Sequence, residues 1–226
     1  MAIEFERIKI LVFDAYGTLF DTDSVTAQSD REFPGHGSEL SHLWRSKQLE
    51  YTWLLSLMGE YQEFWEVTRK ALRFSCHSLG LVLNDTNIRT LMNEYYRLRT
   101  FSDTLPTLEK LTEFRLAILS NGSSDMLERL VNNAGLSSTF EKIFSVDVAK
   151  IYKPSPRAYQ IVCDGLTLEP SEIGFVSANS FDVIGAARFG LQTFWCNRTN
   201  TQLDELDVDP MVEITSLQEL PIILNR

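Results

Sequence analysis

Five short, nearly continuous apolar runs are spread along this chain, and stretches of helical periodicity separate them. The runs cover residues 8–13, 116–119, 143–146, 173–176 and 192–195. Strands that are apolar on both faces and that alternate with helices are typical of a parallel sheet covered on both sides. The sequence therefore predicts an α/β fold whose core is a doubly wound parallel sheet.

The interval between the first two runs, residues 21–101, contains no convincing strand. Helical patterns in this interval cover residues 38–59, 63–79 and 87–96. Ser38 is a suitable N-cap for the first of these helices, and Gly59 is a suitable residue to end it. We therefore expect an inserted helical cap, or lid. The predicted division is a core domain of residues 1–20 and 100–226 and a cap subdomain of residues 21–99.

Composition limits the partners of the protein. The 226 residues carry a formal net charge of −10, and an acidic surface repels nucleic acids and anionic membranes. We therefore expect neither of them as a partner. A small anionic substrate would need its own local cations, for which Arg45 and Lys153 are candidates.

The N-terminus has no basic segment followed by a long apolar stretch, and no apolar run is long enough to cross a bilayer. The three isolated cysteines, Cys76, Cys163 and Cys196, lack metal-binding spacing. Free thiols of this kind fit a reducing compartment. The sequence thus predicts a cytoplasmic protein without a cysteine-based metal centre.

Polar residues follow three of the apolar runs, where the predicted strands end. They are Asp14, Ser120 with Asn121, and Ser177 with Asn179. In open α/β sheets, ligands bind outside the carboxyl ends of the strands, so we expect these side chains to meet. Asp14, at the tip of a buried strand, is placed to act as a nucleophile. A second acid two residues later would protonate a leaving alkoxide, but this chain has Tyr16 there.

The order and spacing of four motifs resemble the haloacid dehalogenase superfamily, a group with a Rossmann-like core. The motifs contain Asp14 and Thr18, Ser120 and Asn121, Lys153 in Tyr-Lys-Pro, and Ser177, Asn179 and Asp182. Most members of that superfamily are magnesium phosphatases, with one acid where this chain has Tyr16 and another where it has Ser177. Mg²⁺ prefers an octahedral shell rich in carboxylate oxygens. The two carboxylates that remain therefore predict no metal site.

The chain resembles the L-2-haloacid dehalogenase branch of the superfamily in having Tyr16 and Ser177 at these two positions, and also in its lid segment of residues 43–53. The resemblance covers nearly the whole chain and implies hydrolysis of L-2-haloalkanoic acids to D-2-hydroxy acids and halide. Asp14 would attack C2 of the substrate and form an ester that water hydrolyses, without metal or organic cofactor. A halide leaves without a proton, so this reaction needs no acid at position 16. A homodimer is also implied, and it suits the aromatic-rich lid.

The resemblance further implies the site residues. The catalytic group would be Asp14, Thr18, Arg45, Ser120, Asn121, Lys153, Tyr159, Ser177, Asn179 and Asp182. The substrate-binding group would be Ala15, Tyr16, Arg45, Leu49, Phe64, Ser120, Asn121 and Phe181. Arg45 would cradle the halide together with Asn121. Ser120 and the backbone N–H groups near Ala15 and Tyr16 would hold the substrate carboxylate.

The remaining implied roles concern the nucleophile, the water and the alkyl group. Lys153 would keep Asp14 ionised by its opposite charge, Thr18 would orient it, and Tyr159 would support the Lys153 end of the site. The hydrolytic water would be positioned or deprotonated by Asp182, Asn179 and Ser177. An apolar wall around the alkyl group would consist of Tyr16, Leu49, Phe64 and Phe181. The family commonly has Trp at the position of Phe181, which implies a looser pocket here.

Other interpretations remain open from the sequence alone. The chain could be a magnesium-dependent phosphatase that has lost its usual acid, or a non-enzymatic binding or scaffold protein that keeps the fold. Asp182 could also N-cap the helix of residues 184–189. Phe64 and Tyr159 could be ordinary core aromatics.

Overall fold

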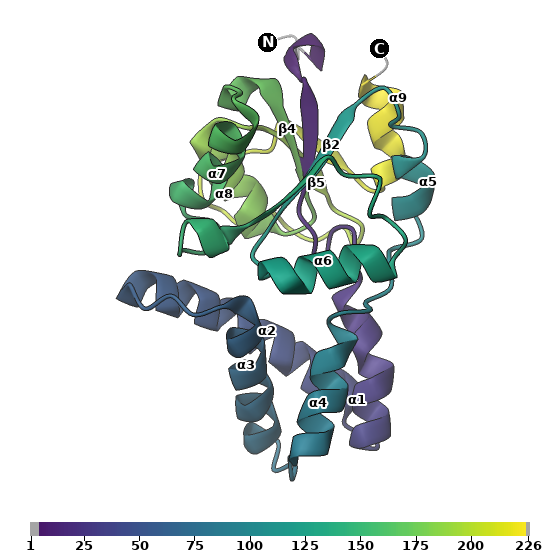
Figure 1. The fold of residues 1–226 in the computed structure, drawn as a ribbon, viewed down its shortest axis with the longest axis vertical. Coiled ribbons are helices and arrows are strands. Elements are labelled where there is room, and N and C mark those ends of the chain that lie inside the picture. Colours follow the sequence, from purple (N-terminus) through teal and green to yellow (C-terminus); the bar gives the residue numbers. More distant parts are fainter. Residues whose placement is uncertain (1–4, 225–226) are drawn as a thin grey trace.

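The computed structural model describes residues 5–224 of the chain, and its core is a six-stranded sheet of order β3-β2-β1-β4-β5-β6 (Figure 1). The strands are β1 (Ile10–Phe13), β2 (Arg115–Ser120), β3 (Lys142–Ser145), β4 (Ile173–Ser177), β5 (Gln192–Cys196) and β6 (Val212–Ile214). All neighbouring strands run parallel. The predicted parallel α/β core is confirmed. The sixth strand was not predicted, because it has only three residues and lies at the sheet edge.

Helices cover both faces of the sheet. They are α5 (Thr104–Leu108), α6 (Ser124–Asn133), α7 (Pro156–Leu166), α8 (Ser180–Phe189) and α9 (Leu220–Leu224). Alternate residues of β1 point to opposite faces. Ile10 and Val12 belong to the hydrophobic cluster that contains residues of α7 and α8. Leu11 and Phe13 belong to the second cluster, with residues of α6 and α9, so the sheet is doubly wound as predicted.

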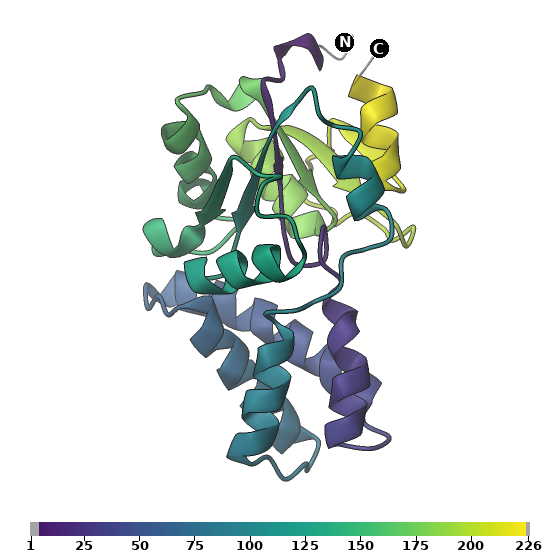
Figure 2. The ribbon, with the colours of Figure 1, turned by 45° about the vertical axis from the view of Figure 1, so that its right-hand side comes forward.

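Four helices between β1 and β2 form the cap. They are α1 (Thr26–Glu32), α2 (Gly37–Met58), α3 (Phe64–Ser78) and α4 (Asp85–Glu94). In both views the cap lies at one end of the sheet, and the carboxyl end of β1 points towards it (Figures 1 and 2). One hydrophobic cluster includes Phe13 of the sheet and Trp44 of the cap, so the two parts share a packed interior. The predicted helical cap is confirmed.

The chain crosses between core and cap at two adjacent segments. Asp21 N donates to Arg99 O at 2.8 Å, and Phe101 N donates to Leu19 O at 3.1 Å. These contacts tie the outgoing and returning segments together. They support the predicted boundaries after residues 20 and 99, which remain a prediction.

The prediction that Ser38 is the N-cap of helix α2 was wrong, because the helix already begins at Gly37. The carboxylate of Asp30 accepts hydrogen bonds from the backbone N–H groups of Gly35 and Gly37, at 2.9 and 3.3 Å. A side chain from α1 therefore does what Ser38 was expected to do. The predicted end is right, because Gly59 adopts a left-handed conformation with φ of 71°.

Helix α2 packs on α3 through its buried face. Trp44 Nε1 donates to Thr68 O at 2.8 Å, and Gln48 Nε2 donates to Thr68 Oγ1 at 2.7 Å. These bonds satisfy polar atoms that would otherwise be buried without partners. They hold the neighbouring α2 face, which carries Arg45, in a defined orientation towards the sheet. No helix within residues 5–224 is long and apolar enough to span a membrane.

Candidate active site

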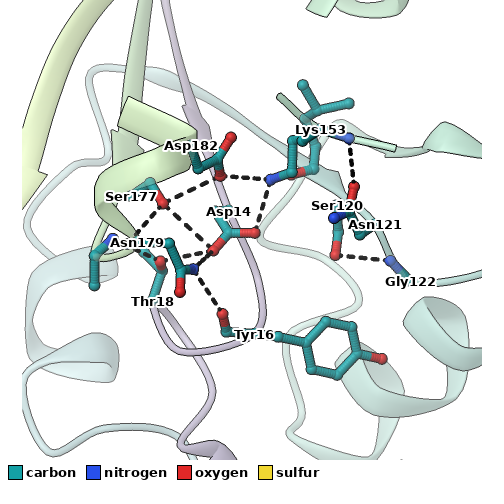
Figure 3. Close-up of polar contacts among 12 residues, drawn as sticks. Asp14, Tyr16, Thr18, Ser120, Asn121, Gly122, Lys153, Ser177, Asn179 and Asp182 are labelled. Atoms are coloured by element: carbon teal, nitrogen blue, oxygen red, sulfur yellow. Dashed lines mark hydrogen bonds and ion pairs between the residues drawn. The ribbon is translucent and has the colours of Figure 1, made fainter. Parts of the chain in front are cut away.

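Side chains from three neighbouring strands meet at the carboxyl edge of the sheet (Figure 3). Asp14 follows β1, while Ser120 ends β2 and Ser177 ends β4. Because β1 lies between β2 and β4, Asp14 occupies the centre of this group. The strand order alone therefore brings together residues that are far apart in the sequence.

Lys153 joins the two carboxylates of the site. Its Nζ lies 2.9 Å from Asp14 Oδ1 and 2.6 Å from Asp182 Oδ2, and it also donates to Leu119 O at 3.1 Å. The side chains of the three charged residues are at most 5% exposed. A buried ion is tolerated only with close partners of opposite charge. The site is thus a compact cluster of two carboxylates around one ammonium group.

The second oxygen of Asp14 is held by neutral donors. Asp14 Oδ2 accepts from Thr18 Oγ1 at 2.9 Å, from Asn179 Nδ2 at 2.8 Å and from Ser177 Oγ at 3.5 Å. Asn179 Nδ2 also donates to Tyr16 O at 3.1 Å. This network fixes the plane of the carboxylate. Oδ1 has one described donor, Lys153, and is therefore the less occupied oxygen.

A tight turn brings Thr18 back to Asp14. Gly17 adopts φ of 88°, a left-handed conformation that suits glycine, and its N–H donates to Phe20 O at 2.7 Å. The amides of Thr18 and Leu19 donate to Ala15 O at 3.2 and 3.0 Å. The local sequence therefore folds so that the Thr18 hydroxyl faces the carboxylate four residues before it.

Asp182 lies in the first turn of α8 but is not its N-cap, so that prediction was wrong. The N-cap position belongs to Asn179. The Asp182 side chain instead accepts hydrogen bonds from Tyr159 Oη at 2.8 Å, Ser177 Oγ at 3.1 Å and Lys153 Nζ. The physical reason is that these partners compete for the Asp182 carboxylate with the backbone N–H groups that it would otherwise cap. Tyr159 accordingly lies at the Lys153 end of the site, with its ring in the core.

The charged groups shift one another's proton affinities. The pKa of Asp182 is raised to about 6, chiefly because burial disfavours the charged form. Lys153 opposes this rise, whereas the charge of Asp14 adds to it. Burial by itself lowers the pKa of Lys153, but the two carboxylates outweigh burial and keep its pKa above the ordinary value. Lys153 is therefore a permanent cation.

Ser120 and Asn121 line the β2 side of the cluster (Figure 3). Ser120 Oγ accepts from Gly122 N at 3.1 Å, which leaves its hydroxyl hydrogen for a ligand. Asn121 Oδ1 accepts from Lys153 N at 2.9 Å, so the amide orientation is set and its N–H₂ end can donate. Both side chains are buried. They present donors, which suits an anion.

Arg45 reaches from the cap to residues 14–20, which we call the nucleophile loop. Its Nη2 lies 3.4 Å from Tyr16 O, and its Nη1 donates to Gln48 Oε1 at 2.6 Å. Two turns further along α2, the Trp53 ring contacts that of Phe181 edge to face, with centroids 5.3 Å apart. Helix α2 thus contacts both the loop after β1 and the first turn of α8.

The predicted apolar wall is brought together in part. The rings of Tyr16 and Phe64 lie 5.5 Å apart, and both are buried. Phe181 lies on the opposite side, in the first turn of α8. Leu49 is half-buried one turn after Arg45, and no contact described for it reaches Asp14. Burial raises the pKa of Tyr16, so its hydroxyl stays protonated.

Arg198 was missed by the sequence analysis. It follows β5 at the same edge of the sheet, and its Nη2 donates to Thr18 O at 2.9 Å. The signal was present, because Asn197 and Arg198 are the polar residues after the fifth apolar run. Applying the strand-tip rule to that run would have identified Arg198 as a candidate.

The donor set does not favour a divalent metal. Across residues 5–224, no three side chains of the metal-binding types His, Cys, Asp and Glu converge on one point. The two carboxylates of the site share an ammonium group, and Ser177 offers only a hydroxyl. A hard cation of octahedral preference would have to compete with Lys153 for both carboxylates.

Comparisons with known proteins agree with this geometry. The model of the haloacid dehalogenase-like hydrolases matches residues 8–190. The chain is 46% identical over 215 residues to an (S)-2-haloacid dehalogenase of Pseudomonas sp. (strain YL), covering 94% of this chain and 93% of that protein. It is 42% identical over 207 residues to haloacetate dehalogenase H-2 of Moraxella sp. (strain B), covering 91% and 92%.

A solved structure is also similar. It is the L-2-haloacid dehalogenase from Xanthobacter autotrophicus with chloropropionic acid covalently bound. The TM-score is 0.93 at 37% identity, over 96% of this chain and 98% of that one. The likeness therefore includes the cap, which is inserted in this chain between β1 and β2.

Proposed function

The chain belongs to the haloacid dehalogenase-like hydrolases, and we propose that it hydrolyses L-2-haloalkanoic acids to D-2-hydroxy acids and halide. It is an (S)-2-haloacid dehalogenase. One observation carries this conclusion: the buried nucleophile Asp14 is paired with Lys153, and the residue two positions after Asp14 is Tyr16 instead of an acid. Such a site can displace a leaving group that needs no proton.

In the first step, Asp14 Oδ1 attacks C2 of the substrate. The new C–O bond forms as the C–halogen bond breaks, and the halide leaves with the electron pair. In-line displacement inverts C2, which accounts for an L substrate and a D product. Hydrogen bonds to Oδ2 from Thr18 and Asn179 hold the carboxylate so that Oδ1 faces the substrate.

The departing halide and the substrate carboxylate need separate sets of donors. We assign the halide to Arg45 and Asn121, because Arg45 reaches the nucleophile loop from the cap and the oriented Asn121 amide can donate. We assign the carboxylate to Ser120 and the backbone N–H groups near Ala15 and Tyr16. Fixed donors aimed at developing negative charge lower the barrier without reorganisation.

In the second step, water attacks the carbonyl carbon of the Asp14 ester. Asp182, with Ser177 and Asn179 beside it, positions this water and accepts one of its protons. The ester C–O bond then breaks, the product oxygen takes up the proton that Asp182 had accepted, and the second proton of the water leaves to solvent, so that both carboxylates are restored. Halide release and hydrolysis are therefore carried out by different residues around one carboxylate.

The assay is direct. The protein is incubated with L- and D-2-chloropropionate in EDTA, and chloride and lactate are measured. We expect chloride and D-lactate from the L-enantiomer only. No chloride from the L-enantiomer would exclude this function, and EDTA-sensitive phosphate release from sugar or aryl phosphates would favour a phosphatase.

Two variants test the assigned roles. Asp14→Asn is expected to abolish turnover, and mass spectrometry checks that the asparagine has not deamidated. Arg45→Ala is expected to slow chloride release while the fold stays intact. Unchanged turnover in Arg45→Ala would remove this residue from the halide site.

A homodimer is also part of this proposal. Trp53, Leu54, Leu57 and Met58 at the end of α2 are exposed, Leu57 by 85%. An apolar surface of this kind favours association. Light scattering is expected to give twice the chain mass, and Leu57→Glu is expected to weaken the dimer. The three cysteines are free and buried, which supports the proposed cytoplasmic location.

A further inference from the structure

Arg198 connects three segments that come from different parts of the chain. Its guanidinium group donates to both carboxylate oxygens of Asp103, at 3.0 and 2.9 Å, and to Thr18 O at 2.9 Å. Its Cζ also lies 4.1 Å from the centre of the Phe101 ring. A planar guanidinium group that binds a carboxylate in two places has little freedom left. We call this set of Arg198, Asp103 and the Thr18 carbonyl the Arg198 brace.

Asp103 is itself held firmly. Its Oδ2 accepts from Ser216 Oγ at 3.1 Å and from Leu217 N at 3.0 Å. Burial alone raises the pKa of Asp103, but Arg198 and these donors outweigh burial, so its pKa lies below the ordinary value. The carboxylate therefore stays charged, and the guanidinium group stays anchored, at neutral pH.

Thr18 links the Arg198 brace to the nucleophile. Its carbonyl accepts from Arg198, while its hydroxyl donates to Asp14 Oδ2 and accepts from Ala178 N, both at 2.9 Å. The carbonyl and the hydroxyl belong to one residue in a tight turn. A rotation of the turn that broke the first contact would also misalign the other two.

The brace also lies where the cap joins the core. Leu19 O accepts from Phe101 N at 3.1 Å and from Thr104 Oγ1 at 3.0 Å, next to Thr18 and Asp103. Arg198 therefore holds the outgoing segment by Thr18 and the returning segment by Asp103. Movements of the cap that pass along these two connecting segments therefore meet these contacts before they reach Thr18.

We propose that Arg198 is a positioning residue that orients Asp14 for attack through Thr18. This inference rests on the proposed function only in taking Asp14 as the reacting group. Arg198 does not touch Asp14 among the described contacts. Its loss should therefore reduce the rate of ester formation and leave substrate affinity nearly unchanged.

Arg198→Met is the test variant, because methionine keeps apolar contact with Phe101 and removes the donors. Arg129→Met is the matched control. Arg129 also pairs with an aspartate, Asp125 at 2.9 Å, and lies over an aromatic ring, but on the exposed face of α6. Each variant loses one arginine that has an ion pair and a ring contact. Of the two arginines, only Arg198 contacts the nucleophile loop.

Two kinds of measurement, enzyme kinetics and amide hydrogen exchange, are made on both variants and the wild type. Single-turnover ester formation with L-2-chloropropionate is expected to slow by about 10- to 100-fold in Arg198→Met, as for other small misplacements of a reacting group. KM is expected to change by less than about threefold, because no substrate contact is lost. Amide hydrogen exchange of residues 14–20 and of Ala178 is expected to accelerate. Arg129→Met is expected to match the wild type in both.

Unchanged ester formation in Arg198→Met, or unchanged exchange of residues 14–20, would overturn the proposal. Equal slowing in Arg129→Met would overturn it as well, since a distant ion pair would then have the same effect. If the wild type itself releases no chloride, the proposed function fails. The exchange measurement alone then tests whether the Arg198 brace holds residues 14–20 in place. Should Arg198→Met not fold, Asp103→Asn replaces it, because that change loosens the anchor and keeps Arg198.

Discussion

The ammonium group of Lys153 lies 2.6 Å from Oδ2 of Asp182, and both side chains are almost completely buried. Lys153 therefore forms an ion pair with Asp182 that is at least as close as its ion pair with Asp14. When Asp14 becomes a neutral ester, Lys153 and Asp182 remain as a balanced pair. Loss of the Asp14 charge also removes one cause of the raised pKa of Asp182. Ester formation thus favours the ionised Asp182 that the second step needs.

Replacement of Lys153 by methionine is expected to abolish turnover and to destabilise the fold. The change leaves two buried carboxylates without their cation, which costs about 3–5 kcal/mol in comparable sites. Urea denaturation measures the free energy of unfolding. Lys47→Met is the control, because Lys47 forms a surface ion pair with Glu50 and its loss is expected to cost less than about 1 kcal/mol. Equal stability of Lys153→Met and the wild type would contradict this account.

The raised pKa of Asp182 predicts a pH dependence of the second step. Asp182 has a pKa of about 6 while Asp14 is charged; in the ester that charge is absent, so Asp182 gains a proton and stops accepting one from water at a pH below about 6. The ester on Asp14 is therefore expected to accumulate below that pH. Mass spectrometry of acid-quenched enzyme measures the modified fraction at each pH. A fraction that stays constant from pH 8 down to pH 4 would remove Asp182 as the proton acceptor.

The same shift has a consequence for stability. The folded protein holds the Asp182 proton more tightly than the unfolded chain, whose pKa is near 3.8. The stabilising contribution of Asp182 is thus fully present below pH 3.8 and is lost as the pH rises through about 6. Asp182→Asn is expected to flatten this part of the curve of unfolding free energy against pH. A curve of unchanged shape in Asp182→Asn would assign the slope to another group.

Tyr16→Phe is expected to stabilise the protein. The Tyr16 hydroxyl is buried and has no hydrogen-bond partner among the described residues. Removing it eliminates an unpaired polar group, which is worth about 1 kcal/mol. Tyr152→Phe is the matched control, because the Tyr152 hydroxyl donates to Gln62 O at 2.5 Å. That variant is expected to be less stable than the wild type, and a destabilised Tyr16→Phe would mean that its hydroxyl has a partner in solution.

Phe181→Trp is expected to narrow the substrate range. Phe181 lies against Trp53, between the cap and the first turn of α8. A larger ring there takes space from the alkyl group of the substrate. We expect kcat/KM for 2-chlorobutyrate to fall relative to that for 2-chloropropionate by about tenfold, the usual effect of one methylene group in a closed pocket. An unchanged ratio would place the alkyl group elsewhere.

Several site residues could be identified from the sequence because their signals are local. Asp14, Ser120 and Ser177 each follow an apolar run, and strand order then brings their tips together. The end of α2 at Gly59 is equally local, since it depends on the conformational freedom of one residue. Signals of this kind depend only on residues close together in the chain, so the rest of the fold does not change what they predict.

The errors have the opposite origin. The Ser38 cap was wrong because Asp30, on another helix, binds the first amide group of α2 and that of Gly35 in the preceding loop. The Asp182 cap was wrong because its side chain turned to Lys153 and Tyr159. In each case a partner distant in the sequence competed with a local hydrogen bond.

By itself, the sequence determined the type of sheet, the inserted cap and the position of the candidate nucleophile, Asp14, at the tip of β1, because alternation and motif spacing depend on adjacent residues. Only the tertiary structure decided that Lys153 lies between two carboxylates and that Arg198 holds the nucleophile loop. The Lys153–Asp14 pair spans 139 positions, and the contact of Arg198 with Thr18 spans 180. Such contacts arise because packing removes these charged groups from water, so each must find an opposite charge or a polar backbone group within the fold.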